Sequence, residues 1–311
     1  YMWFGSQDGL NIFDGKKINI YRPENKNTHT ISGLKISGIV EDENGKVWVG
    51  HENGLSRYDF EKDKFTNFFA GEEVLPIAFK FGKLWLKTSQ KGYISLNVNN
   101  LKYGSFYKKI NYIPNFASNF NSIEIIAPNE YWIVENHGLV HFKQGKTENY
   151  FSNTKDNLFG NTLNIIKIKW FENKLYMGTT QGLLIFDPLK RKIQKIDKYR
   201  NQYFGLVQSL DFDSRGRLWM GTEFLGLVIL DTKTLKIDNI KRKTEFNPGL
   251  KDNLITHLYV DDNDIVWANS DPYGIDKIEV IPGNFGKLTI DFPERFPSEL
   301  KNNSIRAICE D

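Results

Sequence analysis

Apolar and polar residues alternate in short runs along this chain, and one arrangement of runs returns seven times. In each copy an alternating run such as LITHLYVDD leads through a tight turn into an apolar, aromatic run such as LWMGT. A polar turn containing glycine follows, then a third run that usually ends in an aromatic residue and an acid, and a frayed fourth run such as KINIYR. Alternation with a period of two predicts β-strands, so each copy is expected to form four antiparallel strands.

The spacing of the copies predicts the architecture. The aromatic run begins at Met2, Val47, Leu84, Tyr131, Leu175, Leu218 and Val266, so that the repeat length varies between 37 and 48 residues. Four-stranded repeats of this length are typical of β-propeller blades. The sequence therefore predicts an all-β, seven-bladed propeller.

The turn between the second and third runs contains a glycine in every copy. Glycine adopts positive φ at little cost, which suits a tight hairpin. These turn glycines are Gly9, Gly54, Gly92, Gly138, Gly182, Gly226 and Gly274. The aromatic anchors of the second run are Trp3, Trp48, Trp85, Trp132, Tyr176, Trp219 and Trp267, and we expect the tryptophans to pack between neighbouring blades rather than to bind a ligand.

The two ends of the chain are complementary parts of one blade. The chain begins at a second strand, and its last residues, NNSIRAICED, have the first-strand pattern. We expect residues 304–310 to pair with residues 2–5, so that the C-terminal strand completes the N-terminal blade and leaves no open edge there. The predicted domain spans residues 1–311, with blade cores near residues 2–22 plus 304–310, 36–69, 74–107, 121–151, 164–197, 205–241 and 254–291.

Composition excludes several classes of protein. The chain has 311 residues, of which 41 are basic and 38 acidic, and this small excess makes a nucleic-acid partner unexpected. Cys309 is the only cysteine, so no disulfide within the chain is possible. No apolar run reaches the ~20 residues of a membrane helix, and we expect no direct membrane contact. The chain opens in mid-repeat without a start methionine, and we expect it to be a piece of a longer protein.

The repeat resembles the two-component regulator propeller repeat, in which an aromatic-x-Gly-Thr-x-x-Gly-Leu-x-x-aromatic-Asp segment follows an Asp-x-x-Gly turn. LYMGTTQGLLIFDP and DFDSRGRLWMGTEFLGLVILD are the copies most similar to it. The resemblance implies the first propeller of the periplasmic sensor region of a hybrid two-component system. Its implied partners are an oligosaccharide ligand, a second propeller and an immunoglobulin-like domain of the same chain, and a second subunit in a homodimer. The parent protein would be a histidine kinase, and the start of the next domain would follow residue 311.

Several copies depart from this repeat. The glycine two residues after the aromatic anchor is replaced by Lys87, Val134 and Asn269 in the third, fourth and seventh copies. The fourth copy also lacks the acid, with Lys143 after Phe142. We expect these departures to alter the local strand geometry, and they are candidate positions for a site.

Candidate ligand residues lie in the turns between second and third strands and in the loops between blades, which converge on one face of a propeller. These segments combine planar hydrogen-bonding groups with aromatic rings, the mixture that suits sugars. The loops at 23–35, 153–163, 245–253 and 293–303 are expected to surround the same face, and Arg295 would pair with a carboxylate if the ligand is acidic. The candidates are His51, Glu52, Glu135, His137, Tyr199, Arg200, Tyr203, Glu223, Phe224, Asp271, Tyr273 and Arg295.

No residues point to catalysis. The five histidines lack metal-ligand spacing, and neither a phosphate-binding glycine loop nor a nucleophile elbow occurs, so no cofactor, metal or catalytic residue is expected. The leading hypothesis is an extracytoplasmic sensing domain without enzymatic activity of its own. One alternative is a propeller enzyme similar to streptogramin lyases, in which His51, Glu52, Glu135 and His137 would act with a metal. The other is a propeller that serves only as a protein-interaction scaffold.

Overall fold

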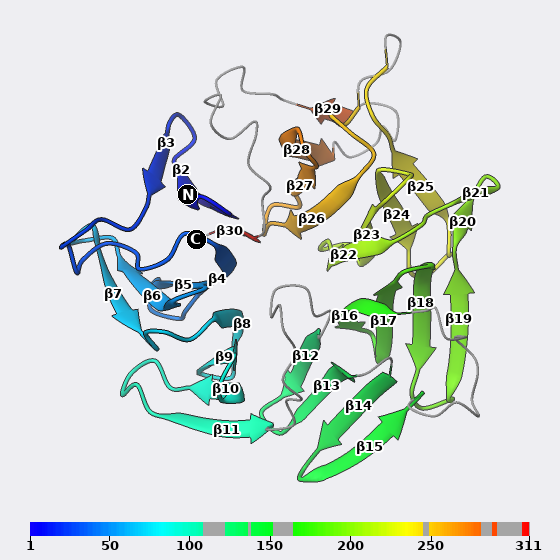
Figure 1. The fold of residues 1–311 in the computed structure, drawn as a ribbon. Coiled ribbons are helices and arrows are strands. Elements are labelled where there is room, and N and C mark those ends of the chain that lie inside the picture. The colour runs from blue at the N-terminus through cyan, green and yellow to red at the C-terminus, as the bar shows by residue number, and fades with distance from the viewer. Residues whose placement is uncertain are drawn as a thin grey trace. The chain divides into compact units, whose positions relative to one another are not determined.

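Where the structure describes this chain, its regular structure is β-strand. A computed structural model describes residues 1–107, 122–135, 138–151, 164–244, 249–280, 288–290 and 307–310 (Figure 1). Within these ranges no helix is long and apolar enough to cross a membrane. The strands of the described residues form seven four-stranded antiparallel sheets, one for each sequence repeat, and one two-stranded sheet. The fold class is the predicted seven-bladed β-propeller.

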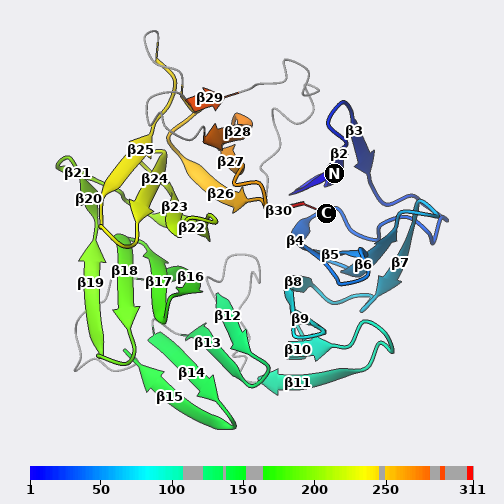
Figure 2. The same ribbon diagram turned by 180° about the vertical axis from the view of Figure 1, so that it is seen from behind.

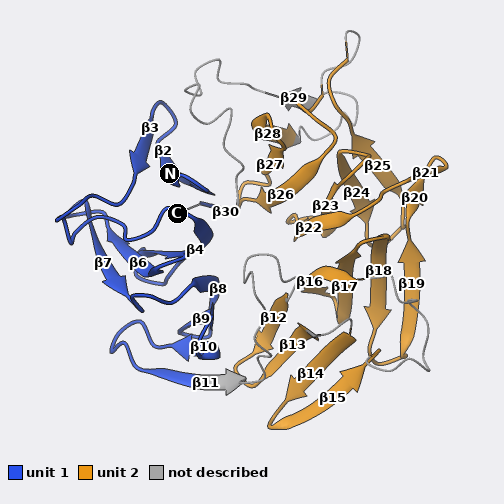
Figure 3. Cartoon of the chain, in the orientation of Figure 1, with its two compact units in different colours: residues 1–119, 295–311 blue, residues 120–294 orange. Residues whose placement is uncertain are grey.

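The chain divides into two compact units, which Figure 3 colours separately, and unit 1 comprises residues 1–119 and 295–311. It contains blades one to three. Blade one has the order β3 (Ile18–Tyr21), β2 (Gly9–Phe13), β1 (Met2–Ser6), β30 (Ala307–Glu310). Blade two runs from β4 (Ile36–Glu41) through β5 (Val47–His51) and β6 (Gly54–Asp59) to β7 (Lys64–Phe68). Blade three runs from β8 (Val74–Lys80) through β9 (Lys83–Thr88) and β10 (Gly92–Leu96) to β11 (Tyr103–Tyr107).

Unit 2 comprises residues 120–294 and contains blades four to seven. Blade four is built from β12 (Ile123–Ala127), β13 (Glu130–Glu135), β14 (Gly138–Lys143) and β15 (Lys146–Tyr150). Blade five is built from β16 (Ile165–Phe171), β17 (Lys174–Thr179), β18 (Gly182–Asp187) and β19 (Lys192–Ile196). Blade six is built from β22 (Val207–Phe212), β23 (Arg217–Thr222), β24 (Leu227–Asp231) and β25 (Ile237–Ile240). Blade seven is built from β26 (Ile255–Val260), β27 (Val266–Ser270), β28 (Gly274–Val280) and β29 (Leu288–Ile290).

The C-terminal strand completes the N-terminal blade, as the sequence predicts. β30 pairs antiparallel with β1, with Trp3 opposite Cys309 and Gly5 opposite Ala307. Residues 304–306 of the predicted pairing lie outside the described residues. Because the strand pairing of blade one joins segments from the two ends of the chain, the N-terminal segment cannot separate from unit 1 without breaking this ladder.

The aromatic anchors pack onto the following blade within each unit. Trp3 lies in one apolar cluster with Ile36 and Val49 of blade two, and Trp48 lies in another with Val74 and Leu86 of blade three. The same packing recurs in unit 2, where Trp132, Tyr176 and Trp219 join clusters with residues of blades five, six and seven respectively. The side chains of Trp3, Trp48, Trp132 and Trp219 are fully buried. The predicted packing role of these tryptophans is confirmed.

A glycine two residues after the anchor lets the next blade approach closely. A Cβ atom at Gly50 would lie 2.2 Å from Pro76 Cδ and 2.3 Å from the Val74 carbonyl oxygen, and one at Gly221 would lie 2.7 Å from the Ile255 carbonyl oxygen. The departures at this position do not disrupt the strands, because β9, β13 and β27 form with Lys87, Val134 and Asn269 in place. The strand order of these blades is therefore kept at the departures, and their effect on local geometry remains a prediction.

Three blades share a turn in which an aspartate binds the anchor tryptophan. The aspartate directly follows the first strand and accepts a hydrogen bond from the indole Nε1 of the tryptophan six residues later. The distances are 2.7 Å for Asp42, 2.9 Å for Asp213 and 2.9 Å for Asp261. The other carboxylate oxygen accepts two backbone N–H groups of the turn. The first aspartate therefore joins the turn to the anchor, both in the Asp-x-x-Gly turns of blades two and six and in blade seven, where Asp264 replaces the glycine with a φ of 61°.

The acid that ends the third strand organises the next turn. Asp231 Oδ1 accepts the backbone N–H groups of Lys233 and Thr234, and Asn97 makes the equivalent bonds in blade three. Blade four lacks the acid because its turn is shorter: β14 and β15 are joined by two residues, Gln144 and Gly145, with φ of 50° and 79°. Two central residues with positive φ indicate a type I′ hairpin, which needs no capping acid.

Candidate ligand surface on unit 2

Seven of the twelve candidate residues lie on neighbouring loops of unit 2. We call this region the turn surface, and define it as residues 197–206, 222–226, 241–244, 249–254 and 271–273. These segments connect or cap blades five, six and seven. Of the candidates, the turn surface contains Tyr199, Arg200, Tyr203, Glu223, Phe224, Asp271 and Tyr273.

A small hairpin forms one end of the turn surface. β20 (Lys198–Tyr199) pairs with β21 (Gln202–Tyr203) across Arg200 and Asn201, whose φ angles are 49° and 62°. The hairpin extends from β19 and lies next to β25 in both views (Figures 1 and 2). Lys198 Nζ lies 4.2 Å from the ring centroid of Tyr203, and Lys241 Nζ donates to Gln202 Oε1 at 2.6 Å. The hairpin is therefore exposed but tied to blade six.

The hairpin and the β23–β24 turn are joined through the backbone. The Phe224 N–H donates to the Phe204 carbonyl at 3.3 Å, and the Glu223 N–H donates to the Leu206 carbonyl at 3.0 Å. Glu223 Oε2 accepts the Leu206 N–H at 3.1 Å in return. The fully buried side chain of Phe204 anchors the joint in the core of blade six.

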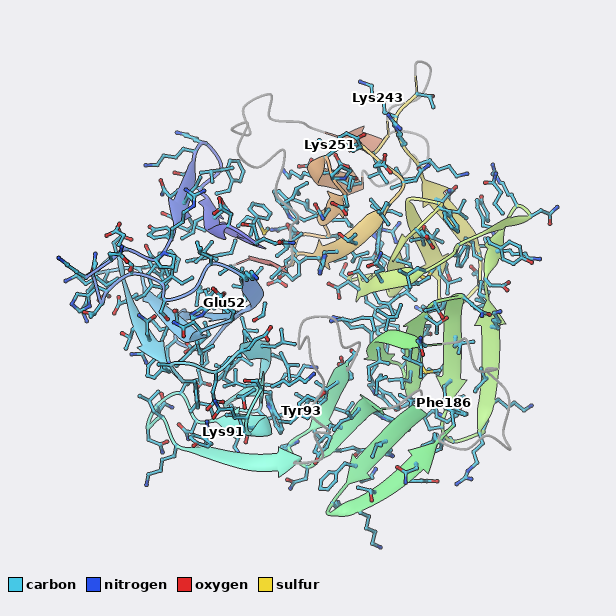
Figure 4. All side chains as sticks on the ribbon, in the orientation of Figure 1. Glu52, Lys91, Tyr93, Phe186, Lys243 and Lys251 are labelled. Carbon is cyan, nitrogen blue, oxygen red and sulfur yellow. The ribbon has the colours of Figure 1, made fainter. Side chains whose placement is uncertain are left out.

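The remaining segments continue the surface towards blade seven. The Gly226 N–H donates to the Asn253 carbonyl, and the Arg242 N–H donates to Asn253 Oδ1 at 2.8 Å. The Asp271 N–H donates to the Leu254 carbonyl at 3.0 Å, which links the β27–β28 turn to the same segment. Lys243 and Lys251, both labelled in Figure 4, lie on this connection between β25 and β26.

A buried carboxylate supports the blade-seven end of the turn surface. Asp276 is fully buried, and its Oδ2 accepts the Lys251 N–H at 3.0 Å and the Ser270 hydroxyl at 2.5 Å. Asp276 Oδ1 has no hydrogen-bond partner within the described part of the chain, and Lys251 Nζ lies 3.8 Å away from it. Burial raises the pKa of Asp276. Two hydrogen bonds and the Lys251 ammonium therefore offset only part of the cost of burying this carboxylate.

His51 holds a turn and offers no exposed surface. Its ring is fully buried, Nδ1 accepts the Asn53 N–H at 3.3 Å, and Nε2 lies 2.8 Å from Ser56 Oγ. Thr179 and Thr222 occupy the same repeat position, and each hydroxyl likewise accepts a backbone N–H of its turn, from Gln181 and Leu225 respectively. Burial lowers the pKa of His51 to about 4, so the ring is neutral near pH 7. Both observations disfavour His51 as a catalytic residue of the lyase type.

The residue after this capping position fastens the loop that leads into the first strand. Glu52, labelled in Figure 4, accepts the backbone N–H groups of Leu34 and Lys35 at 3.0 and 2.8 Å. Thr180 and Glu223 make the equivalent bonds to Asn164 and Leu206. Both carboxylate oxygens of Glu52 are thereby engaged. Comparing the seven turns at this one position, rather than each turn alone, is the sequence signal that would have shown this role.

The other candidates are not placed in this surface. Glu135 ends β13, and the described backbone positions it at the turn of blade four. His137 and Arg295 lie outside the described residues, as do the predicted loops 153–163 and 293–303. No group of three or more histidine, cysteine or acidic residues suited to a metal ion occurs in the ranges that the structure describes.

Comparisons with known proteins support the fold. No family model and no curated protein matches the sequence. Among solved structures, the extracellular domain of BT4673 from B. thetaiotaomicron, described as a hybrid two component system, is similar with a TM-score of 0.67 at 23% identity over 90% of this chain and 37% of that chain. The extracellular domain of BT3049 from the same organism has a TM-score of 0.67 at 18% identity, covering 88% of this chain and 37% of its own.

The lyase named as an alternative is a more distant neighbour. Virginiamycin B lyase from Staphylococcus aureus has a TM-score of 0.56 at 13% identity, over 85% of this chain and 84% of that one. The chain spans little more than a third of the two extracellular domains described above, which have the higher TM-scores. At these identities the likeness shows the fold alone: this chain has the propeller fold that extracellular domains of two-component systems also have.

Proposed function

We propose that this chain is an extracytoplasmic ligand-sensing domain of a hybrid two-component sensor, and that it responds to an oligosaccharide. The observation that carries the proposal is the turn surface. Tyr203, Phe224 and Tyr273 are 58%, 53% and 48% exposed there, on loops that hydrogen bonds hold together. Exposed rings beside amide, guanidinium and ammonium donors match the apolar faces and hydroxyl groups of sugars.

The solved neighbours support the sensor part of the proposal, since two of them are extracellular domains of two-component systems. In such a receptor the domain would lie in the periplasm, beside a second propeller and an immunoglobulin-like domain of a dimeric histidine kinase. Ligand binding would signal only if it favoured one of two receptor states over the other.

Isothermal titration of the purified chain with maltohexaose, cellohexaose, xylohexaose, mannohexaose and hexagalacturonate tests the proposal. Saturable binding of at least one of these probes is expected. Absence of binding to all of them would contradict the oligosaccharide proposal and favour a role in protein interaction.

A further inference from the structure

Two exposed aromatic residues of the turn surface, Tyr203 and Phe224, come from different loops that meet at the backbone of Gly205. Tyr203 lies on the hairpin, two residues before Gly205, and Phe224 lies on the β23–β24 turn. A Cβ atom built on Gly205 would lie 2.6 Å from Phe224 Cε2 and 2.7 Å from Glu223 Oε2. The Phe224 ring therefore lies directly over the Gly205 backbone, where only glycine leaves room, and Gly205 also has a φ of 70°.

The fold does not require an aromatic residue at position 224. The corresponding turn positions in the other described turns are Asp8, Asn53, Gln90, Gln181 and Pro272, none of which is aromatic. Phe224 is more than half exposed, so its burial contributes little to folding.

The hairpin that carries Tyr203 is also additional to the blades. It is the one two-stranded sheet within the described residues, and its turn uses Arg200 and Asn201 in the left-handed region. Left-handed φ costs free energy at a residue other than glycine, more so for arginine than for asparagine. Because the same pair of left-handed residues occurs at Glu172 and Asn173 in an ordinary blade turn, the distinctive property of the hairpin is that it is additional to the blades. An additional element is a candidate for function rather than for stability.

The groups around the two rings are hydrogen-bond donors rather than free carboxylates. Lys198 Nζ lies 4.2 Å from the ring centroid of Tyr203, and Glu223 Oε2 accepts the Leu206 N–H. Arg200, in the turn of the same hairpin, lies 5.0 Å from the ring of the neighbouring Tyr199. Ammonium, guanidinium and phenol donors surrounding aromatic faces suit a pyranose, whose C–H face packs on a ring while its hydroxyl and ring oxygens accept hydrogen bonds.

We propose that Tyr203 and Phe224 form a single aromatic platform on which one oligosaccharide stacks, held in place by the joint at Gly205 and Glu223. The inference rests on the proposed function, because the occupant of the platform is the sensed ligand. It adds that the contacts are concentrated at blade six rather than spread over all the turns.

Titration of the best-binding oligosaccharide of the panel into Tyr203→Ala and Phe224→Ala tests the platform. We expect each variant to bind about fivefold or more weakly, since a ring-stacking contact contributes roughly 1 kcal/mol or more and 1.4 kcal/mol is tenfold in Kd. Leu235→Ala is the matched control: Leu235 is also an exposed apolar side chain of blade six, but lies in the β24–β25 turn. It should leave Kd unchanged, and all three variants should unfold at the wild-type urea midpoint because the replaced side chains are exposed.

The outcomes separate the two proposals. If the wild type binds an oligosaccharide and either Tyr203→Ala or Phe224→Ala binds it with the same affinity, the shared platform is wrong. The proposed function would still hold. Loss of affinity in Leu235→Ala to the same extent also overturns the platform, because the effect would then not be specific to it. A wild-type chain that binds no oligosaccharide overturns both.

Discussion

Replacing Asp213 is expected to destabilise the fold more than replacing its counterpart in another blade. Asp213 Oδ2 accepts Arg217 Nε at 2.6 Å and Trp219 Nε1 at 2.9 Å, while Oδ1 accepts two backbone N–H groups. The side chain of Arg217 is only 9% exposed. Asp213 therefore compensates a buried guanidinium as well as organising the turn.

The expected loss of unfolding free energy follows from the Arg217 guanidinium, which Asp213→Ala leaves buried without its partner. A buried cation that loses its partner costs about 3–5 kcal/mol. Asp42 makes the same turn and indole bonds, but the residue corresponding to Arg217 is Lys46, which is 30% exposed and pairs with Asp59 instead. Asp42→Ala removes hydrogen bonds but leaves no buried charge without a partner. It should lower the free energy of unfolding by about 1–3 kcal/mol.

A double-mutant cycle isolates the contribution of the ion pair between Asp213 and Arg217. Ile265 occupies the Arg217 position in blade seven, so Arg217→Ile is a replacement that the repeat already accommodates. In that background Asp213→Ala should cost about as much as Asp42→Ala does in the wild type. Urea unfolding followed by far-ultraviolet circular dichroism and by tryptophan fluorescence measures each free energy. The reasoning is refuted if Asp213→Ala costs no more than Asp42→Ala, or if Arg217→Ile leaves its cost unchanged.

Three further predictions concern packing and pH. Gly50→Ala should cost roughly 2 kcal/mol or more in urea unfolding because its Cβ would meet Pro76 Cδ at 2.2 Å, whereas Gly104→Ala, which has open space around it, should be nearly neutral. Phe204→Ala should cost about 3 kcal/mol or more and speed amide exchange in the hairpin; unchanged exchange would show that Phe204 does not anchor it. Because the folded-state pKa of Asp276 is raised above the ordinary 3.8, its ionised form destabilises the fold at neutral pH, and Asp276→Asn should be more stable than the wild type at pH 7.5. That advantage should shrink as pH falls through the raised pKa towards 3.8, and a constant difference between pH 7.5 and 4.5 would contradict it.

The blade architecture was predictable because it is repeated. The strand pattern, the anchor tryptophans and the pairing of β30 with β1 each follow from comparing copies, since every copy satisfies the same packing and turn requirements. Six of the predicted turn glycines have positive φ: Gly9, Gly54, Gly92, Gly182, Gly226 and Gly274.

Features that differ between copies were harder to predict. The first strands contain register shifts, as at Ile165/Lys167 and Val207/Ser209, which leave no distinctive residue pattern. The β20–β21 hairpin was also missed as an element, because two strands of two residues are too short for alternation to appear. Tyr199, Arg200 and Tyr203 were candidates because of their residue types, but their link to Phe224 depends on backbone hydrogen bonds.

The candidate residues that fasten loops show the limit of reasoning from residue type. Glu52 and Glu223 are carboxylates at turns, as a ligand site requires, yet each accepts backbone N–H groups of the loop leading into its own blade. His51 is a histidine at a turn, yet burial keeps it neutral and inaccessible. A polar residue at a propeller turn can satisfy the backbone as readily as a ligand.

Amide hydrogen exchange with and without a bound oligosaccharide tests the location of the ligand site most directly. The account predicts slower exchange in residues 198–206 and 222–226 of the wild-type chain, with little change at the β5–β6 turn around Glu52. Slower exchange elsewhere, with the hairpin and the β23–β24 turn unaffected, would contradict the assignment of the ligand to the turn surface.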